Sequence, residues 1–542
     1  MRKRRVFAIC IISIIGIAAL MIWKTEVIPK WARASAVRAL AAYEEGALGM
    51  AIVQDTDFLE ERELQEAQGN PGVLFEGAPL PYDAESNTLY LPQSVGAPDW
   101  EGELSAKDFI LCTTRDAYWQ RKQEAIREGH VFWIWLVDSE CYYRCKLVVS
   151  GTPFVSIDTG TGERIPDSEE LQGTIRVFDP GVGDGRYEIH QSYAACRVKG
   201  NTSRKFDKKS YSLKLQDSRG QKVDAPLLGM RSDNSWKLNA LYTDETRIRE
   251  KTAAQIWEMF SGADKELKQD GPRLEYVELV VNNEYLGLYC LVEPVDEEKL
   301  GLDRNDVLYK VISWTVPTSE AFATAVAEEN STVEGIRISH PGEIVDYGAV
   351  WYPMLDFNER FYINPELDYE EALSTVRVGN LSDVFMFLMV ASASDNHYKN
   401  LYFAAEVRAE GEYVMKQIPW DLDFTFGNIY DGESGNLARF EKDYRYVYAD
   451  SVLPRLKFAR FEEIGPPFLE RWNQYRTGFL NTESILGLLR ENRDYLVETG
   501  AMRRESERWA ECPVTSDITE LLEYQENRME WLDAYFTEWA TQ

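Results

Sequence analysis

Two short stretches decide the interpretation of this chain: SDNHYKN at residues 394–400 and PWDLDFTFG at residues 419–427. The first carries Asp395 and Asn400, and the second carries Asp421 at the start of an Asp-Leu-Asp triplet. Asp and Asn are common in turns because their side chains bond to the nearby backbone, so two polar loops are the simplest interpretation. The alternative is a site for a metal ion and a phosphate, since Mg²⁺ prefers carboxylate and other hard oxygen ligands.

The residues between the two stretches predict a β-hairpin. Apolar, β-type runs at 401–407 and 413–420 flank the turn-like RAEGE at 408–412. An antiparallel pair returns the chain to its starting end, so we expect Asn400 and Asp421 to share one ion. Their side-chain oxygens should then lie within about 5 Å of each other, because each Mg–O bond is roughly 2.1 Å.

The four polar side chains divide by expected role. We expect Asn400 and Asp421 to bind the metal, and Asp395 to stand near them and orient, or take a proton from, an attacking hydroxyl. Asp423 is either a second metal ligand or the cap of the following turn. The Asp-Leu-Asp triplet by itself also resembles the metal-binding DxD motif of sugar-nucleotide glycosyltransferases.

The segments before the hairpin follow the order of parts in a protein kinase. A turn at Gly200 joins two β-type stretches, and the strand SWKLNAL at 235–241 precedes a helix. After two further strands, NLSDVFMFLMVASAS at 380–394 predicts a buried helix capped by Asn380 or Ser382. Kinases likewise place a glycine hairpin, a third strand with its helix, a hinge after the fifth strand and a catalytic loop that ends in Asn.

This order suggests nucleotide-binding residues. Gly200 and Asn201 lie at the hairpin turn, although a tight turn by itself explains a glycine there. A phosphate-binding lysine is expected nearby, and strand order favours Lys237 on the third strand. Glu293 ends the strand that leads to the hinge, where it faces adenine or is an ordinary edge-strand glutamate.

Five stretches in sequence order resemble one family. They are VKGNTSRKFDKKSYSLKL, SWKLNALYTDETRIREKTA, YVELVVNNEYLGLYCLVEPVD, SDNHYKN and IPWDLDFTFG. Together they resemble the CotH kinase family, the atypical kinases similar to spore coat protein H, over about residues 145–510. The resemblance implies an atypical protein-kinase-like fold, the use of ATP with Mg²⁺ or alternatively Mn²⁺, and phosphorylation of Ser in protein substrates.

The resemblance also implies roles for single residues. It matches Asp395 to the catalytic-loop aspartate and Asp421 to the metal-binding aspartate, and it favours Lys209 as the phosphate-binding lysine. The family usually has Arg-Gly-Asn at the hairpin turn, whereas this chain has Lys199 before Gly200. The positive charge is kept, but the bidentate geometry of a guanidinium is lost.

Composition and the N-terminus limit the partners and the location. Lys and Arg number 59 against 90 Asp and Glu, a net charge of −31, which argues against a nucleic-acid partner. Residues 6–23 carry no charge and follow a basic cluster, so we expect a single-pass membrane anchor with most of the chain outside the cytoplasm. A cleaved signal peptide ending within ARASA at 32–36 is the alternative.

The predicted fold class is α+β: a two-lobe, atypical protein-kinase-like fold preceded by a β-rich N-terminal region and a membrane-spanning helix. Six cysteines lie outside the anchor and match no zinc motif, so they are either disulfide-bonded or buried thiols. The predicted parts are a basic flank and anchor at 1–30, a stalk or irregular region at 31–95, a β-rich domain at 96–160, a CotH kinase-like domain at 161–510 and a C-terminal helical tail at 511–542.

Three functions are compatible with these features. The leading hypothesis is a membrane-anchored, ATP- and Mg²⁺-dependent phosphotransferase that acts on a Ser-containing protein. The first alternative is a non-catalytic binding protein of a cell surface or bacterial spore coat that keeps the fold. The second is a glycosyltransferase built around Asp421 and Asp423.

Overall fold

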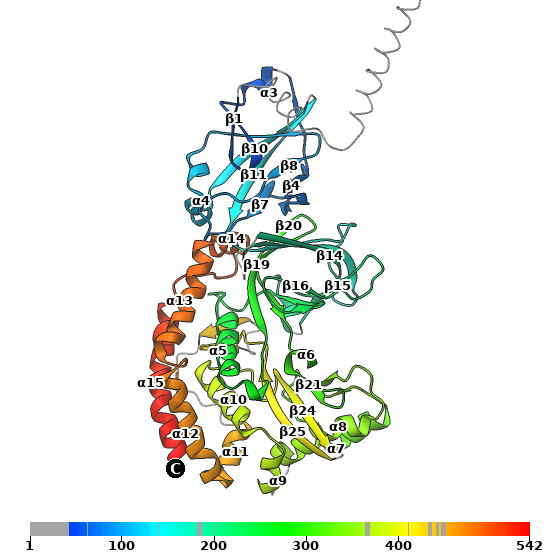
Figure 1. Ribbon diagram of the computed structural model, residues 1–542, viewed down its shortest axis with the longest axis vertical. Coiled ribbons are helices and arrows are strands. Elements are labelled where there is room, and N and C mark those ends of the chain that lie inside the picture. The colour runs from blue at the N-terminus through cyan, green and yellow to red at the C-terminus, as the bar shows by residue number, and fades with distance from the viewer. Residues whose placement is uncertain are drawn as a thin grey trace, which may run out of the picture. The chain divides into compact units, whose positions relative to one another are not determined.

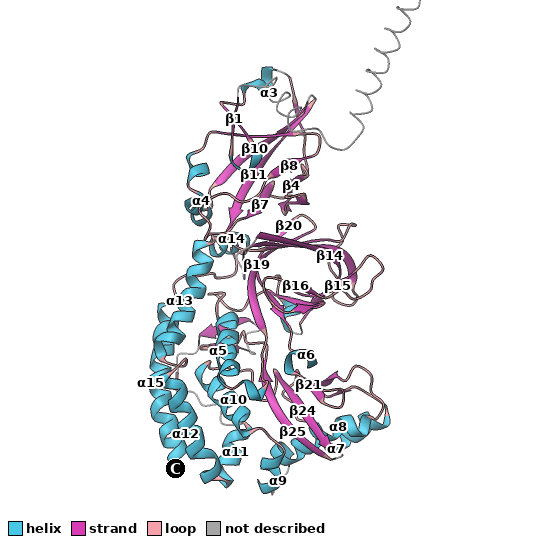
Figure 2. Ribbon diagram, in the orientation of Figure 1, coloured by secondary structure: helices cyan, strands magenta, loops and turns pink. Residues whose placement is uncertain are grey.

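A computed structural model describes the chain at residues 43–61, 63–138, 140–181, 187–200, 202–363, 369–409, 411–431, 436–440, 444–445 and 451–542. These residues form a mixed α+β fold, as predicted, that divides into two compact units, Met1–Val149 and Ser150–Gln542 (Figures 1 and 2). Within the described residues, no helix combines the length and the apolar character that a membrane span needs. The predicted anchor at residues 6–23 lies outside them.

The first unit is built on one large sheet with the strand order β1-β2-β9-β10-β11-β7-β6, in which β3 also pairs with β11. A smaller sheet, β5-β4-β8, completes it, together with the short helices α3 (Asp57–Glu61) and α4 (Lys122–Glu128). The strands are β1 (Tyr43–Glu45), β2 (Ala51–Val53), β3 (Gln65–Glu66), β4 (Val73–Phe75), β5 (Ala78–Pro79), β6 (Tyr82–Asp83), β7 (Thr88–Pro92), β8 (Leu104–Ala106), β9 (Ile110–Thr114), β10 (Val131–Val137) and β11 (Cys141–Ser150).

The second unit contains a closed barrel of seven strands in the order β12-β13-β14-β15-β18-β20-β19. The barrel closes because β12 pairs in parallel with β19, and closure leaves no exposed sheet edge. Its apolar interior includes the buried side chains of Ile175, Leu213, Trp236 and Leu291. The strands are β12 (Phe154–Asp158), β13 (Leu171–Pro180), β14 (Tyr187–Lys199), β15 (Ser210–Gln216), β18 (Ser235–Asn239), β19 (Arg273–Val281) and β20 (Glu284–Glu293).

Helix α5 (Arg249–Ala263) follows β18 and packs against β19. Ile256 and Phe260, four residues apart, are buried on one face of the helix, and the preceding Ile248 is buried as well. Between β19 and β20, Asn282 and Asn283 both adopt the left-handed conformation that a two-residue hairpin turn requires. Short strands β16 (Ala225–Pro226) and β17 (Ser232–Asp233) pair beside the barrel.

A second sheet has the order β22-β23-β21-β24-β25. Helix α10 (Val378–Val390), almost wholly buried, lies against β25. The predicted cap of this helix is wrong, because the helix starts at Val378 and Asn380 instead donates from Nδ2 to the backbone oxygen of Gln417 at 2.9 Å. The strands are β21 (Val307–Val311), β22 (Thr332–Val333), β23 (Ile336–His340), β24 (Leu401–Ala409) and β25 (Glu412–Pro419), and β26 (Asn428–Asp431) pairs separately with β27 (Asn436–Phe440).

The remaining helices enclose this sheet and run along one side of the unit. In Figure 1, α12, α13 and α15 form a long helical layer, and α14 reaches the barrel at β20. The helices are α6 (Glu297–Leu300), α7 (Ser319–Ala327), α8 (Tyr347–Asn358), α9 (Tyr369–Ser374), α11 (Val452–Ala459), α12 (Phe461–Thr477), α13 (Thr482–Glu498), α14 (Ala501–Arg508) and α15 (Thr519–Thr541). The six described cysteines are unpaired, and all except Cys141 are buried.

Candidate functional site

The predicted hairpin is confirmed and joins the two polar stretches. Strands β24 and β25 pair antiparallel from Leu401 opposite Pro419, and the Trp420 N–H donates to the Asn400 carbonyl at 3.1 Å. Asn400 and Asp421, which flank the hairpin, both have positive φ, of 57° and 60°. Asn and Asp tolerate this conformation better than other side chains with a Cβ, and such strained positions cluster at functional sites.

The loop before the hairpin is held by its own polar side chains. Lys399 Nζ lies 2.5 Å from Asp395 Oδ2, and Asn400 Nδ2 donates to the same oxygen at 2.9 Å. The buried Asn396 donates from Nδ2 to the carbonyls of Asn400 and Trp420, at 2.9 and 2.8 Å. Asn396 therefore ties the end of the loop to the end of β25, which brings the loop carrying Asp395 close to Asp421.

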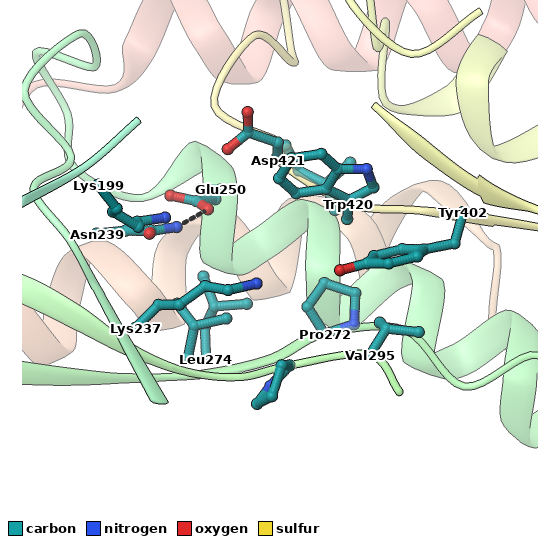
Figure 3. A pocket seen from close by; sticks show the side chains of 13 residues that line it. Lys199, Lys237, Asn239, Glu250, Pro272, Leu274, Val295, Tyr402, Trp420 and Asp421 are labelled. Atoms are coloured by element: carbon teal, nitrogen blue, oxygen red, sulfur yellow. Dashed lines mark hydrogen bonds between the residues drawn. The ribbon is translucent and has the colours of Figure 1, made fainter. Parts of the chain in front are cut away.

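A pocket opens between the barrel and this hairpin (Figure 3). Lys199, Asn239 and Glu250 gather at one end of the view, and Tyr402 and Val295 lie at the other. The lining residues come from the four barrel strands β14, β18, β19 and β20, from α5, from the segments that flank β19 and β20, and from the hairpin and the residues after it. They are Lys199, Lys237, Asn239, Glu250, Pro272, Leu274, Val292, Pro294, Val295, Tyr402, Trp420, Asp421 and Leu422.

Lys199 and Lys237 line the pocket, and the charges of Lys310 and Arg337 lie close to them. Among the residues that the structure describes, none of Lys199, Lys237, Lys310 and Arg337 makes an ion pair within 4.0 Å. Burial and the neighbouring charge of Lys199 lower the pKa of Lys237 to about 8. Burial together with Lys237 and Lys199 holds the pKa of Lys310 well below its usual value. An anion bound here would relieve this repulsion.

Glu250 and Asp421 line the same pocket, and the carboxylates of Asp423 and Asp395 lie close to them. Burial and the nearby Asp421 raise the pKa of Glu250 to about 7, and Asn239 donates from Nδ2 to the Glu250 carboxylate. Burial, Asp421, Glu250 and Asp395 raise the pKa of Asp423 well above the usual range, while Thr243 Oγ1 donates to it at 3.2 Å. Burial also raises the pKa of Asp395, against the opposing effect of Lys399. These carboxylates repel one another, which a bound cation would offset.

Two polar atoms of the pocket have no partner. Asn239 Oδ1 and Trp420 Nε1 are buried and make no hydrogen bond with any residue in the described ranges. Buried polar atoms are almost always satisfied, so both are available to a ligand that supplies a donor and an acceptor. The aromatic wall is close to the cations as well, with Lys310 Nζ 3.6 Å from the Trp420 ring centroid.

The carboxylate and amide oxygens near the pocket suit a divalent cation whose coordination is completed by oxygens of a ligand. They do not suit a metal ion held by protein side chains alone. Within the described residues, no group of three or more His, Cys, Asp and Glu side chains is arranged to hold a metal ion. Asn400 uses its amide nitrogen toward Asp395, which leaves its amide oxygen for a cation. Mg²⁺ commonly takes one or two carboxylates and completes its shell with phosphate oxygens and water, which Asp421, Asp423 and Asn400 allow.

Lys209 and Glu293, which were also predicted to bind the nucleotide, do not line the pocket. Lys209 Nζ donates to the backbone carbonyls of Arg204 and Phe206, at 2.7 and 2.5 Å, and it does not line the pocket. Glu293 is buried beside the pocket-lining Val292, where one oxygen accepts from the Arg231 N–H at 2.9 Å and the other from Lys299.

Gly200 has a φ of +99°, and a Cβ there would lie 1.9 Å from Ser203 Oγ, so the turn itself requires glycine. Asn201 lies outside the described residues. Its neighbour Lys199, on the other side of Gly200, lines the pocket.

Sequence reasoning missed several residues that build the site. Glu250, Asn239 and Lys310 carry no local motif, and Asn396 stands beside Asp395 without a pattern that distinguishes it. Glu250 lies in the first turn of the helix after the third strand, and the corresponding helix of a kinase also carries the glutamate that pairs with its lysine. That signal was present in the order of the elements.

The polar stretches, the third-strand lysine and the helix after it all lie within one matched segment. A family model described as CotH kinase protein matches residues 196–532. The chain belongs to the CotH kinase family. The match begins in β14, ends in α15 and confirms the resemblance expected from the five stretches. No curated protein matches the chain.

Proposed function

We propose that this CotH-family chain is an ATP- and Mg²⁺-dependent phosphotransferase that acts on a Ser hydroxyl of a protein. The observation that carries the proposal is the convergence of Asp395, Asn400 and Asp421 at one end of the β24–β25 hairpin, where Asp421 lines the same pocket as Lys237 (Figure 3). A polar turn alone does not require this convergence, whereas phosphoryl transfer requires cations, a metal ligand and a carboxylate for the acceptor in one place.

The two parts of the second unit fit the two lobes of a protein kinase. The barrel with α5 supplies Lys237 and Glu250, as the lobe with the third strand and its helix does in kinases. The sheet with β24 and β25, together with α10, supplies the catalytic loop and Asp421. Val292, Pro294 and Val295 line the pocket where β20 ends, at the place of the adenine hinge.

The residues divide the chemistry as follows. Lys237, Lys199 and Lys310 bind the phosphate oxygens. Because they make no ion pair within the described part of the chain, their charge is available to the phosphate. Asp421 and Asn400, with Asp423, hold Mg²⁺, which neutralises phosphate charge when bound. Asp395 orients the acceptor hydroxyl and receives its proton as the new O–P bond forms and the bond to the leaving diphosphate breaks.

We choose Lys237 over Lys209 as the main phosphate-binding lysine. Lys237 lines the pocket, whereas Lys209 donates to two backbone carbonyls of its own turn. Because the Lys237 ammonium has no carboxylate partner within the described residues, an incoming phosphate displaces no existing ion pair.

Nucleotide-binding calorimetry on the full-length protein tests the proposal. We expect ATP to bind with Mg²⁺, with a clear loss of affinity when Mg²⁺ is chelated, and a sugar nucleotide to bind weakly or not at all. Mn²⁺ should substitute for Mg²⁺. Binding of a sugar nucleotide in preference to ATP would favour the glycosyltransferase, and binding of neither would favour the non-catalytic protein.

Part of the proposal concerns location. The uncharged segment 6–23 with its basic flank supports a single-pass anchor that leaves the catalytic part outside the cytoplasm. Resistance of the membrane-bound protein to carbonate extraction and its cleavage by protease on intact cells are the expected results. A soluble form that begins near residues 34–37 would show a cleaved signal peptide instead.

A further inference from the structure

We infer that Ile312 and Trp314 form an apolar docking site for the acceptor polypeptide, next to the loop that carries Asp395. This inference rests on the proposed phosphotransfer and names the kind of acceptor that the site recognises. The acceptor is a protein segment with a large apolar or aromatic side chain close to the phosphorylated serine.

The two side chains are exposed although they are large and apolar. Ile312 is 46% exposed and Trp314 is 50% exposed. A single exposed apolar side chain is ordinary. Two of them, separated by one residue and next to a candidate catalytic loop, indicate a binding surface. Tryptophan is also one of the three residue types enriched among the side chains that dominate binding at protein interfaces.

Contacts place Trp314 at the catalytic loop. Its ring stands edge-on to the His397 ring at 5.7 Å between centroids, and Lys399 Nζ lies 5.9 Å from the Trp314 ring centroid. The same Lys399 Nζ lies 2.5 Å from Asp395 Oδ2. An extended chain advances about 3.3 Å per residue, so a peptide with its hydroxyl at Asp395 reaches Trp314 within two or three residues.

The segment that carries the pair is fixed and does not hang as a loose loop. The Ile312 N–H donates to the Gly335 carbonyl at 2.9 Å, and the Asn400 N–H donates to the carbonyl of Val311 at 3.0 Å. At Gly335, where φ is +92°, an added Cβ would lie 2.3 Å from Ser313 Cβ, so the glycine permits the close approach. A rigid apolar surface binds a partner at a lower entropy cost than a flexible one.

The experiment compares two sets of synthetic Ser peptides with full-length protein, [γ-³²P]ATP and Mg²⁺. One set carries Leu or Phe two or three residues from the serine, and the other carries only Gly and Ala. The variants are Trp314→Ala, Ile312→Ala and the conservative Trp314→Phe. Phe458→Ala is the control, because Phe458 is 90% exposed on α11 and touches no residue of the catalytic loop in the described contacts. Fluorescence anisotropy of labelled peptides measures binding without any transfer.

For Trp314→Ala we expect the KM for the Leu and Phe peptides to rise roughly tenfold, a loss typical of an interfacial tryptophan, with ATP hydrolysis in the absence of peptide unchanged. Trp314→Phe should recover most of the loss, and Phe458→Ala should match the unaltered protein. An equal loss for all peptides together with slower ATP hydrolysis would overturn the inference, since Trp314 would then act by positioning Lys399. Unchanged KM, or stronger binding of oligosaccharides than of peptides at Trp314, would overturn it too.

If the protein binds no ATP, the proposed function fails, but the anisotropy measurement still decides this inference. Weaker binding of the Leu and Phe peptides to Trp314→Ala than to Phe458→Ala would support docking at this surface. Equal binding to both variants would contradict it.

Discussion

The backbone N–H of Trp420 donates to the carbonyl of Asn400 at 3.1 Å, across the open end of the β24–β25 hairpin. This bond fixes the residue before Asp421 against the residue that ends the loop carrying Asp395. The side-chain amide of Asn396 donates to the carbonyls of Asn400 and Trp420 and strengthens this connection. Asn400 and Asp421, twenty-one positions apart in the sequence, are thereby brought together.

The first prediction concerns Asp421. Asp421→Asn should abolish phosphate transfer and remove the Mg²⁺-dependent part of ATP affinity, because the amide has lost the charge that holds the cation. Calorimetry with and without Mg²⁺ measures both effects. Asp356→Asn, on α8 away from the pocket, is the matched control and should keep the metal dependence. Undiminished Mg²⁺ dependence in Asp421→Asn would remove this residue from the metal site.

The second prediction separates the two lysines that the sequence left open. Lys237→Ala should weaken ATP binding by roughly tenfold or more, as expected for loss of a charge-assisted bond to phosphate. Lys209→Ala should leave ATP affinity within about twofold, because the Lys209 ammonium is occupied by two backbone carbonyls and lies outside the pocket lining. Titration calorimetry distinguishes the two, and the reverse order of effects would contradict the assignment.

The same lysine predicts a pH dependence of binding. Burial and Lys199 lower the pKa of Lys237 to about 8 in the ligand-free protein. Below this pH the lysine is charged and binds phosphate, so ATP affinity should fall as the pH rises through about 8 and above. The Lys237→Met variant should bind ATP weakly, and its ATP affinity should not fall in this pH range. An equal fall in both proteins would show that another group causes the pH dependence.

Glu250 predicts how stability changes with pH. Burial and Asp421 raise its pKa from 4.5 to about 7, so the folded protein binds this proton more tightly than the unfolded chain. The stability contributed by this proton is therefore fully present below pH 4.5 and is lost as the pH rises through 7. A shift from 4.5 to about 7 at about 1.4 kcal/mol per pKa unit corresponds to about 3–4 kcal/mol. Glu250→Gln removes the titration, so its melting temperature relative to the unaltered protein should rise between pH 5 and pH 8. A constant difference across this range would contradict the assignment.

Glu505 predicts a large loss of stability. This fully buried carboxylate on α14 lies 2.6 Å from Lys208 Nζ and 2.9 Å from Arg247 Nε, and it accepts the Leu288 N–H at 2.7 Å. Glu505→Ala leaves two buried cations uncompensated and should cost about 3–5 kcal/mol, seen as a lower melting temperature.

The control for this stability prediction is Glu284→Ala. Its partner Arg508 and the carboxylate are both substantially exposed, and an exposed ion pair contributes at most about 1 kcal/mol. A comparable loss of stability in the two variants would show that burial at Glu505 does not matter.

The sequence predicted the hairpin that supports the site, because a hairpin depends on residues that are close together in the chain. Alternating apolar residues around the turn predict the hairpin, and the hairpin alone places Asn400 next to Asp421. The order of strands likewise placed Lys237 on the third strand, where it lines the pocket.

What the sequence could not show depends on contacts between distant segments. The barrel closes through β12 and β19, more than a hundred residues apart, and no local pattern specifies that pairing. Asn380 was predicted to cap a helix, but the helix starts earlier and Asn380 bonds to Gln417 on a neighbouring strand. Lys310 lies over the ring of the pocket residue Trp420 because β21 pairs with β24.

Transfer of ³²P from [γ-³²P]ATP by the full-length protein, compared with Asp395→Asn, tests the central claim most directly. The unaltered protein should label itself or a Ser-rich peptide in Mg²⁺ or Mn²⁺. Asp395→Asn should lose this transfer while it keeps ATP affinity within a few fold, because Asp395 serves the acceptor hydroxyl rather than the nucleotide. Transfer by Asp395→Asn at the rate of the unaltered protein, or no transfer by the unaltered protein with either metal ion, would contradict the account.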